Sequence, residues 1–320
     1  MTGTPILIAL VTALSMASAH GYSVRPPATD QNGSTVAATA VSLDHVPIAV
    51  RDLERARRHW SQDLGFTLKP GRVHENGIEN AHIKFADGTA LELITASRPG
   101  DALAASYIAL LEKGEGGAFL ALEPADFAQV ETAISKAGHA YDVITGPYYR
   151  WLTFSEGTPL DYLFFNRITN VPVDSPEMLR HANGALGLGA VWIAGDRAAG
   201  TRQLLAAIGT GESGGTVVLP GGRVADRVRL DAGELYLFRG GQGDHPAVAG
   251  ITIRVPELAA VRRALGTDTS AFTSGEDARG RFLRVTPEHA NGVWLEFLEV
   301  ASINGIGKSP ATDTKEDERG

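Results

Sequence analysis

Three short segments of the chain carry imidazole and carboxylate side chains in patterns suited to joint chemistry. His45 lies in LDHVPIAV, His82 in NAHIKFAD and Glu92 in TALELIT. Each segment alternates polar and apolar residues, which is typical of a strand with one buried face. Two imidazoles and one carboxylate can hold Zn, Fe, Mn or Ni while leaving coordination positions open. We therefore predict His45, Glu92 and His82 as ligands of a divalent metal.

The polar row of the second segment holds further candidates. Asn80, His82 and Lys84 share one face of that strand. Polar side chains in a closed interior cost free energy unless they are paired or something binds there. We predict Asn80 as substrate-binding and Glu92 and His82 as catalytic groups that move a proton. The alternative is structural, with His45 buried and hydrogen-bonded and Glu92 as its ion-pair partner.

A second cluster lies in GPYYRWLTF, residues 146–154. Tyr148, Arg150 and Trp151 combine aromatic walls with a guanidinium, a mixture that suits an anionic or aromatic ligand. We predict these three as substrate-binding residues. The alternative, which applies above all to Tyr149 and Trp151, is a half-exposed strand with ordinary alternation.

Other motifs favour structural roles. His-Ala-Asn-Gly occurs at 181–184 and again at 289–292. Because Asn-Gly favours tight turns, His181 and His289 are only secondary site candidates. Cleavage after Ala19 would expose His20, which could chelate copper, but so short a match is weak. No Walker A or HExxH motif occurs.

The candidate residues belong to a pattern of elements that occurs four times. A short apolar strand, an acidic residue and an amphipathic helix are predicted at residues 43–66, 118–138, 187–209 and 248–266. Strand-like runs follow each helix, and the copies lie about 60–75 residues apart. After the first helix these runs are 66–69, 80–88 and 89–97. The recurring acid is expected to cap each helix; these acids are Asp52, Asp126, Asp196 and Glu257.

These sequences resemble a known family. LDHVPIAVRDLERARRHWSQDLGF, followed by GIENAHIKFADGTALELITAS, is similar to the glyoxalase-like branch of the vicinal oxygen chelate superfamily. SPEMLRHANGALGLGAVWIAGD and EHANGVWLEFLEV resemble it too. The resemblance covers residues 43–300 and implies an α+β fold. The fold would have four tandem βαβββ modules, paired into two cup-shaped, half-open β-barrels flanked by helices. Isomerases, lyases, dioxygenases and binding proteins share this fold, so the reaction stays open.

The resemblance also implies a place for the metal. The family holds it with a histidine on a first strand and a glutamate on a fourth, and His45 and Glu92 occupy those positions. Only Glu296 repeats the fourth-strand glutamate, and Tyr236 or a neighbour replaces it in the third module. The residues that replace His45 in the other modules are Phe119, Gly189 and Gly250.

Composition excludes several classes of function. The chain has 320 residues, a net charge of −8 and 43% hydrophobic residues, enough for a large core. No block is rich in uncompensated Lys and Arg, so nucleic acid is not an expected partner. The chain has no cysteine, which excludes disulfides, thiolate metal sites and cysteine nucleophiles.

The termini predict export. Residues 5–19 are apolar and end in Ala-Ser-Ala, which is typical of a cleaved signal peptide. We expect a periplasmic or secreted protein with no stable membrane insertion after cleavage. The predicted division is a signal peptide (1–19), a flexible linker (20–41), two glyoxalase-like module pairs (42–170 and 171–303) and a disordered tail (304–320).

Together these features predict a divalent-metal-dependent enzyme of the lyase, isomerase or dioxygenase type. Its substrate would be a small oxygen-bearing molecule, and the chain would act as a monomer or homodimer. The alternative is a metal-free small-molecule-binding or resistance protein with the same fold.

Overall fold

The computed structural model describes residues 28–29, 35–36, 40–169, 173–240, 246–266 and 272–300. The predicted signal peptide and tail, and most of the predicted linker, lie outside these residues. Within the linker only β1 (Ala28–Thr29) and β2 (Thr35–Val36) are described, as an antiparallel pair. Among the helices that are described, none has the length and apolar character needed to cross a membrane.

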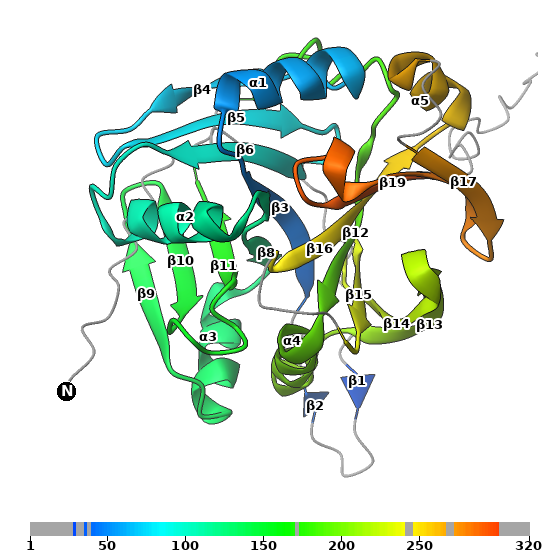
Figure 1. The fold of residues 1–320 in the computed structure, drawn as a ribbon. Helices are drawn as coiled ribbons and strands as arrows, with labels where there is room; N and C mark the ends of the chain where they lie inside the picture. The colour runs from blue at the N-terminus through cyan, green and yellow to red at the C-terminus, as the bar shows by residue number, and fades with distance from the viewer. Residues whose placement is uncertain are drawn as a thin grey trace, which may run out of the picture.

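From residue 41 on, the elements run as a strand, a helix and three strands in four successive stretches (Figure 1). The first comprises β3 (Val41–Ala49), α1 (Leu53–Arg58) with η1 (His59–Asp63), β4 (Lys69–Val73), β5 (Ile78–Lys84) and β6 (Ala90–Ala96). The second comprises β8 (Leu120–Pro124), α3 (Phe127–Lys136), β9 (Tyr141–Thr145), β10 (Tyr149–Phe154) and β11 (Leu163–Ile168). Between these two lie α2 (Ala102–Lys113) and β7 (Gly116–Gly117).

The second half of the chain repeats this order. The third stretch comprises β12 (Gly187–Ala194), α4 (Gly195–Ala207), β13 (Glu212–Leu219), η2 (Pro220–Gly222), β14 (Arg223–Arg229) and β15 (Glu234–Phe238). The fourth comprises β16 (Val248–Val255), α5 (Leu258–Leu265), β17 (Phe272–Asp277), β18 (Gly280–Val285), η4 (Pro287–His289) and β19 (Trp294–Glu299). The chain is therefore a strand-rich α+β protein with few helices, as predicted.

Strand pairing joins the stretches two by two. The first strand of each stretch runs parallel to the last, as β3 does to β6 and β12 to β15. The first strands of neighbouring stretches then pair antiparallel, β3 with β8 and β12 with β16. The resulting orders are β4-β5-β6-β3-β8-β11-β10-β9 and β13-β14-β15-β12-β16-β19-β18-β17. The sheet is strongly curved and is not closed.

Alternation along the strands separates two faces. In β3, Val46 and Ile48 are fully buried and pack with Leu53 and Trp60 of α1 and η1 in the main core cluster. This outer face is covered by α1 and α3 in the first half and by α4 and α5 in the second. The opposite, inner face carries His45. The predicted apolar rows are therefore confirmed as the faces that pack beneath the helices.

Some local predictions are wrong. The strand predicted at 66–69 begins only at Lys69, because Phe66 is buried in the main core and stacks at 5.9 Å on Phe297. Side-chain capping occurs at Asp52 and Asp126, but no side-chain cap forms at α4 or α5. Asp196 lies inside the first turn of α4 instead.

Candidate functional site

The inner face of the first half holds a row of buried polar side chains, which we call the first cup. It consists of His45 from β3, Asn80, His82 and Lys84 from β5, and Glu92 from β6, all no more than 6% exposed. The strands that carry them are neighbours through the pairings β3–β6 and β5–β6. The structure thus brings the leading sequence candidates onto one surface.

His45 and Glu92 form the centre of the first cup. His45 Nε2 lies 3.9 Å from Glu92 Oε2, and both side chains are buried. The pairing of β3 with β8 shifts at Asp44, which forms a β-bulge next to His45. Bulges re-aim side chains and are common beside functional sites. Here Asp44 Oδ1 comes within 3.4 Å of His45 Nδ1, so the imidazole lies between two carboxylates.

A chain of contacts holds this arrangement. Asn166 of β11 donates a hydrogen bond to Asp44 and accepts one of 2.6 Å from the indole Nε1 of Trp151. Burial alone would raise the pKa of Asp44, but His45 and the hydrogen bond from Asn166 outweigh it and lower that pKa. Asp44 is therefore an ionised residue that positions His45. Neither Asp44 nor Asn166 was predicted from the sequence, because a bulge leaves no mark in an alternating pattern.

Glu92 has the opposite electrostatics. Its Oε1 accepts a hydrogen bond of 2.7 Å from Asn80, whose own oxygen accepts from the backbone N–H of Arg72 at 3.0 Å. Burial raises the pKa of Glu92, and His45 only partly opposes the shift. A buried carboxyl group whose pKa is raised holds its proton more readily and can pass it to a neighbouring group. The pair is therefore suited to acid–base chemistry.

His82 and Lys84 complete the row. Among the described residues, neither His82 Nδ1 nor Lys84 Nζ has a hydrogen-bond partner. Burial lowers the pKa of Lys84 to about 8, although Glu92 and Asp44 oppose the shift. Burial and the neighbouring Lys84 hold the pKa of His82 well below its usual value, so its ring is neutral at pH 7. The sequence pattern placed Lys84 on this face but did not single it out.

The donors of the first cup do not form the predicted metal centre. In the part of the chain that the structure describes, no group of three or more His, Asp or Glu side chains lies close enough to hold a metal ion. His45 and Glu92 supply two donors. Phe119 and Phe164 take the corresponding places in the second stretch and offer no lone pair, and the Phe164 ring packs edge-on against His45 at 5.6 Å. The described donors do not make up a three-ligand set. Metal binding by His45, Glu92 and His82 stays a prediction.

The second predicted cluster divides between two faces. Trp151 is buried on the inner face and stacks at 4.2 Å on Tyr149. Arg150 points to the outer face, where it pairs with Glu131 of α3 at 2.5 Å. Because neighbouring residues of a strand face opposite sides, the prediction that Arg150 and Trp151 line one site is wrong. Tyr148 is 56% exposed and lies outside the cup.

Helix α2 covers the inner face beside this row. Its Leu103 and Tyr107 pack with Ile94, Trp151 and Phe164 in a separate apolar cluster. A cavity of only about 20 Å³ remains between α2 and these strands. That is room for about one water molecule, so a larger ligand requires α2 or its side chains to move.

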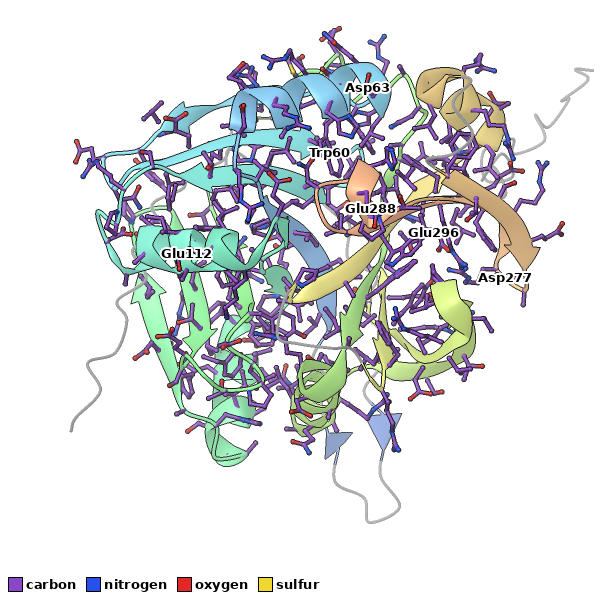
Figure 2. All side chains as sticks on the ribbon, in the orientation of Figure 1. Trp60, Asp63, Glu112, Asp277, Glu288 and Glu296 are labelled. Atoms are coloured by element: carbon purple, nitrogen blue, oxygen red, sulfur yellow. The ribbon has the colours of Figure 1, made fainter. Side chains whose placement is uncertain are left out.

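The corresponding surface of the second half, the second cup, is built from Trp192, Tyr236, Thr252, Arg284 and Glu296. Figure 2 labels Glu296 near its centre and Asp277 at its rim. Every oxygen of Glu296 is engaged: Arg279 donates to both at 2.6 and 3.1 Å, and Arg284 donates at 2.7 Å. Thr252 adds a bond of 3.0 Å, so this network is internally satisfied.

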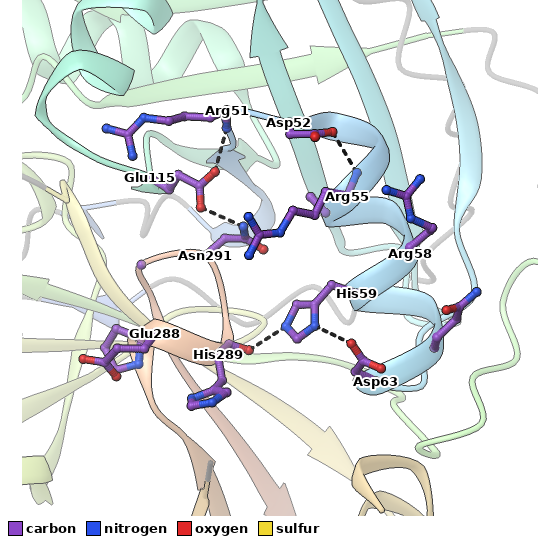
Figure 3. Close-up of a pocket in the computed structure, with 14 residues that line it drawn as sticks. Arg51, Asp52, Arg55, Arg58, His59, Asp63, Glu115, Glu288, His289 and Asn291 are labelled. Atoms are coloured by element: carbon purple, nitrogen blue, oxygen red, sulfur yellow. Dashed lines mark hydrogen bonds and ion pairs between the residues drawn. The ribbon is translucent and has the colours of Figure 1, made fainter. Parts of the chain in front are cut away.

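A further cavity lies between α1–η1 and the turn before β19 (Figure 3). It measures about 980 Å³ and is a cleft between the first and fourth stretches. His59 bridges it, contacting Asp63 Oδ2 at 2.8 Å and the carbonyl oxygen of His289 at 2.9 Å. Trp60 donates to Asn291 at 2.7 Å, and Asn291 donates to Glu115 at 2.9 Å. These contacts join the two halves of the chain.

The two His-Ala-Asn-Gly turns also connect distant segments. His181 is buried, and its ring bridges the backbone N–H of Thr67 and the carbonyl oxygen of Lys84 at 3.0 Å each. Asn291 and Gly292 both have positive φ, as the Asn-Gly pair favours. The structural interpretation of these motifs therefore fits the contacts.

Comparison with known proteins places this fold. A model of the glyoxalase-like domain matches residues 43–209, more than half of the chain. The chain belongs to the glyoxalase-like domain family, within the vicinal oxygen chelate superfamily. It is also 32% identical over 123 residues to the uncharacterized protein YwbC of Bacillus subtilis (strain 168), covering 36% of this chain and 97% of that one.

Solved structures resemble this glyoxalase-like protein over most of its length. A 2,2',3-trihydroxybiphenyl 1,2-dioxygenase from Sphingomonas wittichii strain RW1 superposes with a TM-score of 0.55 at 16% identity, covering 83% of this chain and 98% of that chain. A mutant of 4-hydroxymandelate synthase from Streptomyces coelicolor gives 0.54 at 14% identity, covering 81% and 92%. At these identities the likeness shows the fold alone.

Proposed function

We propose that this glyoxalase-like protein is an enzyme of the lyase or isomerase type that moves a proton on a small oxygen-bearing molecule held in the first cup. One observation carries the proposal: His45 and Glu92 lie 3.9 Å apart, buried on the inner face, with Asp44 at the other ring nitrogen of His45. A base that is oriented by a carboxylate and lies next to a second proton carrier is a recurring catalytic arrangement.

The electrostatics support a division of roles. The pKa of Asp44 is lowered and that of Glu92 is raised, because hydrogen bonds and His45 dominate at Asp44 whereas burial dominates at Glu92. Titratable groups whose environments push their pKa values apart are typical of acid–base sites. We assign proton transfer to Glu92 with His45, positioning to Asp44, and ligand contact to Asn80 and His82.

Two alternatives to this proposal, a dioxygenase and a metal-dependent lyase or isomerase, can be tested. A bound Zn, Fe, Mn or Ni would supply Lewis acidity, but the donors among the described residues do not complete a three-ligand set, so no step is derived through a metal. Similar solved structures are named as enzymes of oxygen-bearing aromatic molecules, which supports a small oxygen-bearing ligand. Metal analysis of the purified protein, with Zn, Mn, Fe and Ni titrations, tests the metal-dependent variants. Stoichiometric metal that is lost in His45→Gln would contradict metal-free chemistry.

Solvent exchange tests the proposed proton transfer even while the product is unidentified. The protein is incubated in D2O with small hydroxy acids, keto acids and aldehydes, and proton NMR follows the loss of carbon-bound hydrogen. We expect exchange that falls by about 100-fold or more in Glu92→Gln and His45→Gln. Glu112→Gln, at an exposed position of α2, is the matched control. Ligand binding with no exchange would instead favour the binding or resistance protein.

Export belongs to the proposal as well. The apolar segment 5–19 supports a periplasmic or secreted protein, and that segment lies outside the described residues. Expression of the full chain with N-terminal sequencing of the exported product tests this point. A retained, uncleaved N-terminus would contradict it.

A further inference from the structure

The ammonium of Lys84 is the most unusual group in the first cup. It is 1% exposed, and its Nζ has no hydrogen-bond partner or ion pair among the described residues. A cationic neighbour on the adjacent strand, Lys69, pairs with Asp174. An unpaired buried ammonium costs several kcal/mol, so proteins rarely keep one without a use for it.

Lys84 also lies on the same face as the proposed proton-transfer pair. It is the last residue of β5, and its partner Ala90 stands one inner-face position before Glu92 on β6. His82, two residues before Lys84, pairs directly with Glu92 across the strands and has an unpartnered ring nitrogen of its own. These two unpartnered nitrogen atoms therefore lie beside the pair that is formed by His45 and Glu92.

We propose that the ligand of the first cup is a small monocarboxylate whose carboxylate group pairs with Lys84. Among the described residues, Lys84 carries the one ammonium without a partner that faces the cup. Its single positive charge balances the single negative charge of a carboxylate but not the two of a phosphate dianion. A carboxylate held at β5 presents its neighbouring oxygen-bearing carbon to β6 and β3, where Glu92 and His45 lie. This inference rests on the proposed function and names the substrate class of the same site.

Matched anionic and neutral probes test the inference. Thermal shift and calorimetric titrations use acetate, lactate and pyruvate, then acetamide, lactamide and inorganic phosphate, all at constant ionic strength. We expect the monocarboxylates to raise the melting temperature of the wild type and to bind at least tenfold more weakly to Lys84→Met. Lys136→Met removes an exposed lysine of α3 and should bind like the wild type.

Each outcome decides between the two proposals. Equal binding of lactate and lactamide, or equal binding of lactate by the wild type and Lys84→Met, would overturn the carboxylate inference and leave the cup as a ligand site. Tighter binding of phosphate than of any monocarboxylate would also overturn it. Absence of any shift would overturn it together with the proposed binding site. Lys84-dependent binding without proton exchange would support this inference while the proposed reaction fails.

Discussion

The two cups share one architecture but differ in how their buried charges are satisfied. In the second, Glu296 receives four hydrogen bonds from Arg279, Arg284 and Thr252. In the first, Lys84 Nζ and His82 Nδ1 have no hydrogen-bond partner among the residues that the structure describes. Fully satisfied polar networks rigidify a fold, whereas unsatisfied groups lower stability and leave donors for a ligand. The difference suggests that the second cup supports the structure and the first provides the chemistry.

Removing the carboxylate of each cup should separate these roles most clearly. Glu296→Gln leaves the buried guanidinium of Arg284 without the carboxylate it pairs with, so we expect a loss of about 3–5 kcal/mol in the free energy of unfolding. Glu92→Gln should cost roughly 1 kcal/mol or less, since burial already disfavours the charged form of Glu92. Urea unfolding of both variants measures the contrast. Equal losses would break the comparison.

The pH dependence of stability should single out Lys84. Its pKa is about 8 in the folded chain and 10.5 in a free lysine. Between these values the unfolded chain binds more protons, so stability rises with pH, and below about pH 8 the whole penalty applies. We expect the wild type to gain up to about 3 kcal/mol relative to Lys84→Met between pH 8 and 10.5. Urea titrations at about pH 7, 8.5 and 10 measure this, and a constant difference would contradict it.

At pH 7 the same substitution should stabilise the protein. Lys84→Met removes a buried charge that has no partner among the described residues, and it keeps most of the side-chain volume, so we expect a gain of roughly 1–3 kcal/mol. Arg284→Met, the matched change in the second cup, should destabilise because it leaves Glu296 with one fewer partner. Chemical unfolding at pH 7 compares the two. Destabilisation by Lys84→Met would mean that its ammonium is paired in solution.

The smallest expected difference concerns helix capping. Asp52→Ala removes the bond of 2.9 Å from its side chain to the N–H of Arg55 and should cost about 1 kcal/mol. Asp196→Ala should change stability by less than about 0.5 kcal/mol, because α4 has no side-chain cap. Thermal unfolding resolves the pair. A larger cost for Asp196→Ala would contradict the helix start seen in the structure.

Much of the fold could be predicted from periodicity. The alternation of β3, β5 and β6 placed His45, His82 and Glu92 on one inner face, and the structure confirms that placement. Helix α2 was not predicted, although Asp101 caps it with a bond of 2.8 Å to Ala104. Its place over the inner face depends on packing against distant strands, which a local pattern does not encode.

The site itself was only partly predictable, for three physical reasons. The bulge at Asp44 depends on strand register, which sequence alternation alone does not reveal. Arg150 was grouped with Trp151 by proximity in sequence, whereas the strand turns the two to opposite faces. The proposed role of Lys84 rests on its lack of a partner among the described residues. That lack becomes visible only when all the neighbouring strands are in place.

A crystal structure of the protein with bound lactate or pyruvate tests the central contrast most directly. We predict a carboxylate oxygen about 3 Å from Lys84 Nζ, with the adjacent carbon facing Glu92 and His45, and an unchanged Arg279–Glu296–Arg284 network. A ligand in the second cup that displaces Glu296, or a Lys84 ammonium paired with Glu92 and no ligand beside it, would contradict the account.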